Sequence, residues 1–244
     1  MKSILKNIST KNVIKDPFPH LDIVDALPEN IYECMVNELP KTEVLDEYFK
    51  NSKSHTSAVS ISKDILSELN LKTPYIDEFI QIHSGEDFKN DILNLFSDYL
   101  SECFPDLKYH LLNSTEAKLF VNPKKTVVSN LNKENKTFIR GPHLDDPGEI
   151  GVFLYYINRS ENNIKGSDLN LYEYNTRFRG FRRDIWWDER ELKSNHVKKV
   201  KTIKYQGNRF IFLLDGIKSI HGVTPLDTSS VGYRMRLSGG INTK

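Results

Sequence analysis

From about residue 118 onward, the chain is a series of short runs rich in β-branched and aromatic residues, with turn residues between them. No segment with a convincing helical period separates these runs, which argues against parallel strands joined by crossover helices. We therefore expect antiparallel pairing in a sandwich, a jelly roll or a barrel. The predicted strands are 118–121, 126–128, 151–157, 168–174, 200–205, 209–214 and 233–237.

The first third of the chain has a helical pattern instead. Residues 28–39, 74–84 and 88–103 each repeat apolar side chains at intervals of three or four. Pro28 and Pro74 stand at the start of their segments, where the first turn of a helix tolerates proline. We expect these helices to form a layer packed against the sheet. No internal repeat or linker-like composition divides the chain, so one domain covering 1–244 is predicted.

Charge limits the class of partner. The chain has 34 Lys+Arg against 33 Asp+Glu, a net charge of +1, which argues against a general nucleic-acid or membrane-surface binder. The balance is uneven, however, because the segment 176–204 holds ten basic and four acidic residues. This segment reads as an insertion. It is either a solvated excursion, or a lid whose Arg177 and Arg179, near Trp186, meet an anionic substrate.

Cysteine usage and hydropathy bear on the compartment. Cys34 and Cys103 are far apart and give no disulfide framework, which favours a reducing, cytoplasmic location. The longest apolar run, 150–157, is too short to span a bilayer, and the first eleven residues lack the apolar region of a secretion signal. We expect no membrane partner, and the oligomeric state stays open.

The chemistry is concentrated in the segment 141–148, which reads GPHLDDPG. Alternate residues of an extended segment share a face, so His143 and Asp145 point the same way and Leu144 points away. Asp146 starts a tight turn with proline and glycine, and we exclude it from the site because it would face away or cap the turn.

A second histidine, His221, follows the buried-strand pattern of 209–214 and lies 78 residues after His143. Two imidazoles and one carboxylate match the facial triad that holds Fe(II) and leaves other positions open. A closed structural zinc site would want four ligands, usually with thiolates. An H-x-D spacing alone is weak, and taken by itself it is better explained by a surface turn. The order of turn-bounded H-x-D, strands, distal histidine and arginine-bearing strand favours the metal site.

From about Ala117 to Ile241, roughly half the chain, the sequence resembles the 2-oxoglutarate and Fe(II)-dependent oxygenases, closest to their prolyl-4-hydroxylase-like branch. The residues that carry the resemblance are HLDDP at 143–147, GVFLYYIN at 151–158, GSDL at 166–169 and HGVTP at 221–225, with DPFPH at 16–20 as a typical opening.

The resemblance implies a fold that is mainly β with α, namely a double-stranded β-helix (jelly-roll) core buttressed by N-terminal helices. Residues 1–116 would be the mainly helical support layer, and 117–244 the jelly-roll core with the insertion 176–204. Three departures from the family pattern are visible. Its usual Gly-Gly pair is Gly166-Ser167 here, the stretch Val121-Asn122-Pro123 stands near the place of its upstream tyrosine, and the insertion 176–204 is longer than in its small members.

The same resemblance implies site residues. His143, Asp145 and His221 would be the metal ligands. A basic residue after the distal histidine would hold the far carboxylate of 2-oxoglutarate. Arg234 fits that role best, Arg236 stays open as the alternative, and Tyr156 matches an aromatic position that lines the co-substrate pocket.

The implied activity is a dioxygenase that uses Fe(II), 2-oxoglutarate and O₂, with ascorbate as an additive in vitro. It would hydroxylate an unactivated C–H bond of a small, anionic or amino-acid-derived substrate and release succinate and CO₂. Three alternatives stay open: a non-catalytic metal- or ligand-binding jelly-roll module, a prolyl-type protein hydroxylase, and a cupin-like metal hydrolase that needs no 2-oxoglutarate.

Overall fold

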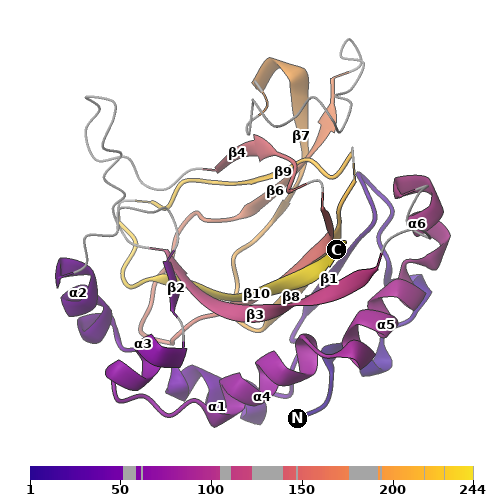
Figure 1. Cartoon of the computed structure of the whole chain (residues 1–244). Helices are drawn as coiled ribbons and strands as arrows, with labels where there is room; N and C mark the ends of the chain where they lie inside the picture. The colour runs from indigo at the N-terminus through magenta and orange to yellow at the C-terminus, as the bar shows by residue number, and fades with distance from the viewer. Residues whose placement is uncertain are drawn as a thin grey trace.

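Two antiparallel sheets face each other in the computed structural model, and helices cover the outer side of the larger sheet (Figure 1). The structure describes residues 1–51, 59–61, 63–104, 111–122, 140–146, 148–175, 192, 194–216, 218–227 and 229–243. The larger sheet has the strand order β1-β8-β5-β10-β3-β2, and the smaller has β4-β9-β6-β7. This is the jelly-roll-like arrangement with N-terminal helices that the sequence predicts.

The strands, in chain order, are β1 His20–Val24, β2 Val59–Ile61, β3 Leu112–Asn122, β4 Arg140–His143, β5 Glu149–Ile157, β6 Leu169–Tyr174, β7 Val197–Ile203, β8 Arg209–Leu214, β9 His221–Val223 and β10 Arg234–Thr243. The helices are α1 Glu29–Glu38, α2 Thr42–Asn51, α3 Lys63–Glu68, α4 Pro74–His83, α5 Glu86–Leu95 and α6 Ser97–Cys103, with short 3-10 turns at Ile4–Asn7, Thr10–Asn12 and Ser194–His196.

The predicted antiparallel pairing is confirmed for every pair in both sheets. Two predictions from the sequence pattern differ from the structure. The insertion predicted at 176–204 is too long, because Val197–Ile203 is strand β7 of the smaller sheet and pairs with β6. Strands β1, β2, β4 and β9 are not among the predicted strand ranges. All four are short, and β1, β2 and β4 lie at the edges of their sheets. The predicted strand at 126–128 lies outside the described residues.

The helical layer follows the predicted pattern with one break. Thr73 is the N-cap of α4 and Pro74 occupies its first turn, as predicted. The period over 88–103 is not one helix but two, because Phe96, with φ −103° and ψ 11°, ends α5 and begins α6. The side chain of Phe96 is fully buried, so the break keeps it in the core.

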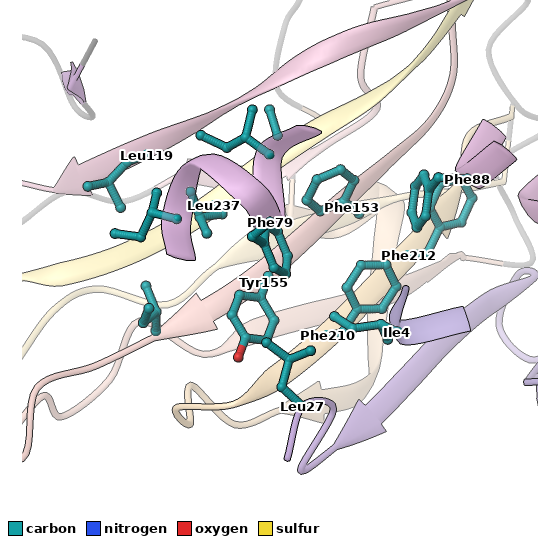
Figure 2. Close-up of a cluster of buried hydrophobic side chains, with 14 of the residues drawn as sticks. Ile4, Leu27, Phe79, Phe88, Leu119, Phe153, Tyr155, Phe210, Phe212 and Leu237 are labelled. Carbon is teal, nitrogen blue, oxygen red and sulfur yellow. The ribbon is translucent and has the colours of Figure 1, made fainter. Parts of the chain in front are cut away.

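The main core lies between the helices and the outer face of the larger sheet (Figure 2). Phe79 of α4 is fully buried and stacks on Tyr155 of β5 at 4.7 Å between ring centroids. Phe153 of β5 and Phe210 of β8 stack at 5.6 Å on the same face. Alternation along β5 thus sends Phe153 and Tyr155 to this core and leaves Tyr156 to face the smaller sheet.

His83 at the end of α4 makes the stability of this layer depend on pH. Its Nδ1–H donates to the carbonyl of Phe79 at 2.8 Å, and its Nε2 accepts from the backbone N–H of Ile4 at 3.2 Å. Burial lowers the pKa of His83 to about 4. In the unfolded chain the imidazole takes up a proton from about pH 6.5 downward, and the folded chain does not do so until about pH 4.

We therefore expect His83 to cost the protein about 3 kcal/mol of unfolding free energy as the pH falls from 7.5 to 4, and about 2 kcal/mol of that by pH 5. Urea unfolding at pH 7.5 and pH 5 measures the effect. His83→Gln should be less stable at pH 7.5 but should lack this part of the pH dependence. Equal pH dependence in the two proteins would show that His83 does not titrate in this way.

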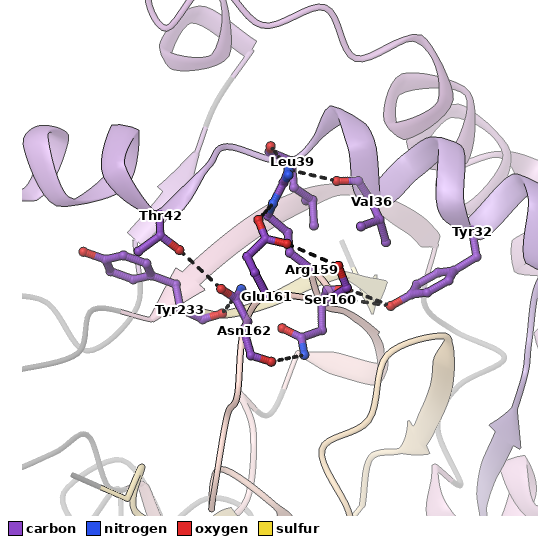
Figure 3. A network of polar contacts seen from close by, with 10 residues as sticks. Tyr32, Val36, Leu39, Thr42, Arg159, Ser160, Glu161, Asn162 and Tyr233 are labelled. Carbon is purple, nitrogen blue, oxygen red and sulfur yellow. Dashed lines mark hydrogen bonds and ion pairs between the residues drawn. The ribbon is translucent and has the colours of Figure 1, made fainter. Parts of the chain in front are cut away.

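A polar network ties the connection after β5 to the helices and to the start of β10 (Figure 3). Arg159 donates to the carbonyls of Val36 and Leu39 at 3.3 and 2.9 Å, which satisfies backbone groups at the end of α1. Asn162 donates to the carbonyl of Tyr233 at 3.4 Å. The network therefore fixes the backbone immediately before Arg234.

No helix in the described part of the chain is both long enough and apolar enough to cross a membrane.

Candidate metal centre and anion site

The smaller sheet brings the two predicted histidines together. His143 ends β4 and His221 begins β9, and the two residues are paired across the strands. His221 is also paired with Leu171 of β6, whose side chain packs between the sheets against Ile211 and Leu213 of the larger sheet. Directly paired residues share a face, so both imidazoles point into the space between the sheets.

Asp145 completes the group. Its Oδ1 lies 3.5 Å from Nε2 of His143, and its Oδ2 lies 3.2 Å from Nε2 of His221. One ligand atom from each of the three residues lies within 4.8 Å of the others. Metal–ligand bonds of about 2.0–2.2 Å place neighbouring ligand atoms roughly 3 Å apart, so these side chains fit around one ion.

The hydrogen bonds of the two histidines leave the correct nitrogen for a metal. Nδ1 of His143 lies 2.8 Å from the carbonyl of Gly141, and Nδ1 of His221 lies 3.0 Å from the carbonyl of Ser219. Because a carbonyl only accepts, each Nδ1 carries a proton, and Nε2 is the nitrogen that remains for a metal. Nε2 of His143 is buried and has no hydrogen-bond partner among the described residues. Backbone acceptors of this kind orient metal-ligating histidines.

The charges of the three residues are coupled. Burial, followed by the neighbouring charge of His221, lowers the pKa of His143 to about 4. Burial alone would raise the pKa of Asp145, but the charge of His221, together with the closeness of both imidazoles to the carboxylate, holds this pKa well below its usual range. Burial would lower the pKa of His221, but the charge of Asp145 raises it. At neutral pH the group holds a carboxylate and a neutral His143, which is the form a cation binds.

The residues next to the triad behave as the spacing predicts. The side chain of Asp146 is exposed, and its Oδ1 accepts from the N–H of Gly148 at 3.1 Å, so it caps the turn. Leu144 points to the opposite side and packs with Leu192 and Ile220. Arg140 lies 3.4 Å from Asp145 on the exposed side of the site.

Across from the triad, Arg234 lies on the inner face of the larger sheet. Its side chain is 2% exposed. Nη1 donates to Oδ1 of Asn122 at 3.0 Å and Nη2 to the hydroxyl of Tyr156 at 3.3 Å. The guanidinium also lies over the Tyr156 ring at 5.1 Å. Its Nε is buried with no hydrogen-bond partner among the described residues. The structure thus brings Arg234 and Tyr156 together in a buried cationic site.

Arg236, the alternative to Arg234, shares this face. It is paired with Tyr156 of β5 and with Phe120 of β3. Its Nη1 donates to the same Oδ1 of Asn122 at 3.1 Å, and its guanidinium lies over the Phe120 ring at 4.7 Å. Both arginines therefore converge on one amide oxygen.

Sequence reasoning missed two residues of this site. Asn122 was noted only as part of the stretch 121–123 that stands near the place of a family tyrosine, yet its Oδ1 accepts from both arginines. Tyr205, which follows β7, has its hydroxyl at 3.1 and 3.2 Å from the carbonyls of Ile157 and Met235 and its ring 5.4 Å from Arg234. The register that pairs Arg234 with Asn122 could have identified the first, but it depends on strand pairing that the sequence does not give.

The Gly166-Ser167 departure has a backbone explanation. Gly166 has φ +75° and Ser167 has φ +57°, so both residues adopt the left-handed region that glycine enters most easily. A Cβ on Gly166 would lie 2.1 Å from the carbonyl oxygen of Pro225. Ser167, shortly before β6, therefore adopts a left-handed backbone conformation that is less favourable for serine than for glycine.

The remaining predicted substrate residues, Arg177, Arg179 and Trp186, lie outside the described residues.

Comparison with solved structures gives several matches of low identity. A prolyl-4-hydroxylase of Pseudomonas putida is similar over 92% of this chain and 92% of that one, with 11% identity and a TM-score of 0.45. A prolyl hydroxylase of Trichoplax adhaerens, solved with a hypoxia inducible factor peptide, is similar over 91% and 83%, with 15% identity and a TM-score of 0.45. The epimerase SnoN, solved with Fe³⁺, alpha ketoglutarate and nogalamycin RO, is similar over 91% and 78%, with 10% identity and a TM-score of 0.48.

No protein-family model and no curated protein matches the chain. The chemistry proposed below therefore depends on the geometry of its own side chains.

Proposed function

We propose that this protein is an Fe(II)- and 2-oxoglutarate-dependent dioxygenase that hydroxylates a small molecule. The observation that carries the proposal is the pair of opposed sites between the two sheets. One holds two imidazoles and a carboxylate with both Nε2 atoms available, and the other is a buried arginine whose described partners are all neutral.

His143, Asp145 and His221 would hold the metal. Two imidazoles and one carboxylate with other positions left open are typical of non-haem Fe(II) in oxygenases. When bound, the iron supplies the redox chemistry that couples oxidation of 2-oxoglutarate to succinate and CO₂ with hydroxylation of a C–H bond. The chain itself fixes the imidazole tautomers through Gly141 and Ser219.

Arg234 would hold the distal carboxylate of 2-oxoglutarate. A guanidinium presents parallel N–H groups to a carboxylate, and the pair is strengthened where water is excluded. Tyr156 adds a hydroxyl beside the guanidinium, and the rings of Tyr156 and Tyr205 lie against it. These residues bind and orient the co-substrate and keep water from its charged end.

Replacing the arginine tests this assignment. We expect Arg234→Met to weaken 2-oxoglutarate binding by about 30-fold or more, because truncating one partner of a buried hydrogen-bonded charge pair costs roughly 2–5 kcal/mol. Anaerobic calorimetry of the Fe(II)-loaded protein measures the dissociation constant. Lys50→Met, which removes an exposed positive charge from α2, is the control and should bind the co-substrate as the unaltered protein does.

Equal affinity in Arg234→Met and the unaltered protein would contradict this role. Failure of the unaltered protein to bind 2-oxoglutarate would instead favour a metal-binding module, or a hydrolase that ignores the co-substrate.

A further inference from the structure

Two arginines face the space between the sheets, and no described residue gives either of them an acidic partner. Arg234 and Arg236 donate to the same Oδ1 of Asn122, at 3.0 and 3.1 Å. Asn122 is itself 3% exposed and carries no charge. Charged groups removed from water are normally paired, so two guanidinium groups that meet at one neutral oxygen indicate a site built for anions.

The two arginines differ in access. Arg234 is buried, and its guanidinium carbon lies 5.1 Å from the centroid of the Tyr156 ring and 5.4 Å from that of the Tyr205 ring. Arg236 is only half-buried and lies over the single ring of Phe120 at 4.7 Å. Burial, followed by the charge of Arg234, lowers the pKa of Arg236 to about 9. Arg236 is therefore the cation that solvent, or a molecule entering between the sheets, can reach.

The formal charges at the site assign different roles to the two arginines. This assignment rests on the proposed function. The two positive charges of Fe(II) and the one of Arg234 balance the carboxylate of Asp145 and the two carboxylates of 2-oxoglutarate. Arg140 is left out of this count because its side chain lies on the exposed side of the site, and Glu149 is left out because burial raises its pKa to about 7. The charge of Arg236 has no counterpart in this set.

We propose that Arg236 binds a carboxylate of the primary substrate. One unbalanced positive charge suits one carboxylate better than a phosphate group, which carries roughly 1.5 to 2 negative charges near pH 7. The planar guanidinium is held by Asn122 and by the Phe120 ring, so part of its ordering is complete before a ligand arrives. The substrate class is thus a small carboxylic acid.

The test is calorimetry on the protein loaded with Zn(II) in place of Fe(II) and saturated with 2-oxoglutarate. The probes are acetate, butyrate and phenylacetate, each paired with its primary amide, which has nearly the same shape and no charge. We expect at least one acid to bind about tenfold or more tightly than its amide, because the pair with Arg236 is charge-assisted. In Arg236→Met the ratio should fall to about one. Lys50→Met, which removes an exposed charge from α2, should bind the acid more tightly than the amide by the same ratio as the unaltered protein.

The outcomes are distinct. If no acid binds more tightly than its amide, or if the preference survives in Arg236→Met, the inference is overturned. It is also overturned if Arg236→Met weakens 2-oxoglutarate as much as Arg234→Met does, since Arg236 would then belong to the co-substrate. A protein that binds no 2-oxoglutarate at the outset contradicts the proposed function, and this inference with it.

Discussion

Asp145→Ala is expected to abolish metal binding at the site and, with it, conversion of 2-oxoglutarate. The carboxylate is the only anionic ligand of the triad, and both imidazole Nε2 atoms lie within 3.5 Å of it. Loss of even an outer partner of a metal ligand commonly costs about 10–100-fold in affinity, so loss of the ligand itself should cost ~100-fold or more. Equilibrium dialysis with Fe(II) under anaerobic conditions measures the metal affinity directly.

Asp146→Ala is the matched control. It removes a carboxylate from the next residue, but that side chain is exposed and caps a turn through Gly148. We expect a metal affinity within about threefold of the unaltered protein, since the cap acts on the backbone alone. If Asp145→Ala and Asp146→Ala bound the metal equally well, the triad would be wrong.

Phe79→Ala should cost about 3–5 kcal/mol of unfolding free energy, the largest stability loss that we expect from one substitution. Phe79 is fully buried and stacks on His83 at 4.0 Å and on Tyr155 at 4.7 Å, so its removal leaves a cavity where α4 meets the larger sheet. Urea unfolding at pH 7.5 measures the loss.

Tyr75→Ala on the same helix is the comparison, because its side chain is 36% exposed. A surface aromatic in this position should change the unfolding free energy by about 0.5 kcal/mol or less. A loss below about 1 kcal/mol for Phe79→Ala would mean that the helical layer does not depend on this aromatic stack.

The pattern of the chain predicted the parts of the fold that local chemistry determines. Strand β8, Arg209–Leu214, was predicted at its observed bounds because a continuous apolar run between turn residues has few other structures available. Asp146 was predicted either to face away from His143 or to cap the turn, and it caps the turn, a geometry that aspartate before proline and glycine favours in a short segment. The H-x-D face of His143 and Asp145 follows from alternation alone.

What could not be predicted depends on which strands are neighbours. Asn122 lies 112 residues from Arg234 in the chain, and only the pairing of β3 with β10 brings the amide to the guanidinium. Phe96 ends one helix and begins another although the apolar period continues, and its ring packs on that of Phe212 with 5.2 Å between the ring centroids. Burial against a distant strand overrides a local period in that case.

The measurement that tests the central claim most directly is release of labelled CO₂ from 2-oxoglutarate by the purified protein with Fe(II), O₂ and ascorbate. The label is placed either on the carboxylate next to the keto group or on the distal one. We predict release from the first position only, with an equal amount of succinate, and none from Asp145→Ala. A protein that binds Fe(II) but releases no label from either position, with or without small carboxylic acids present, would contradict the claim.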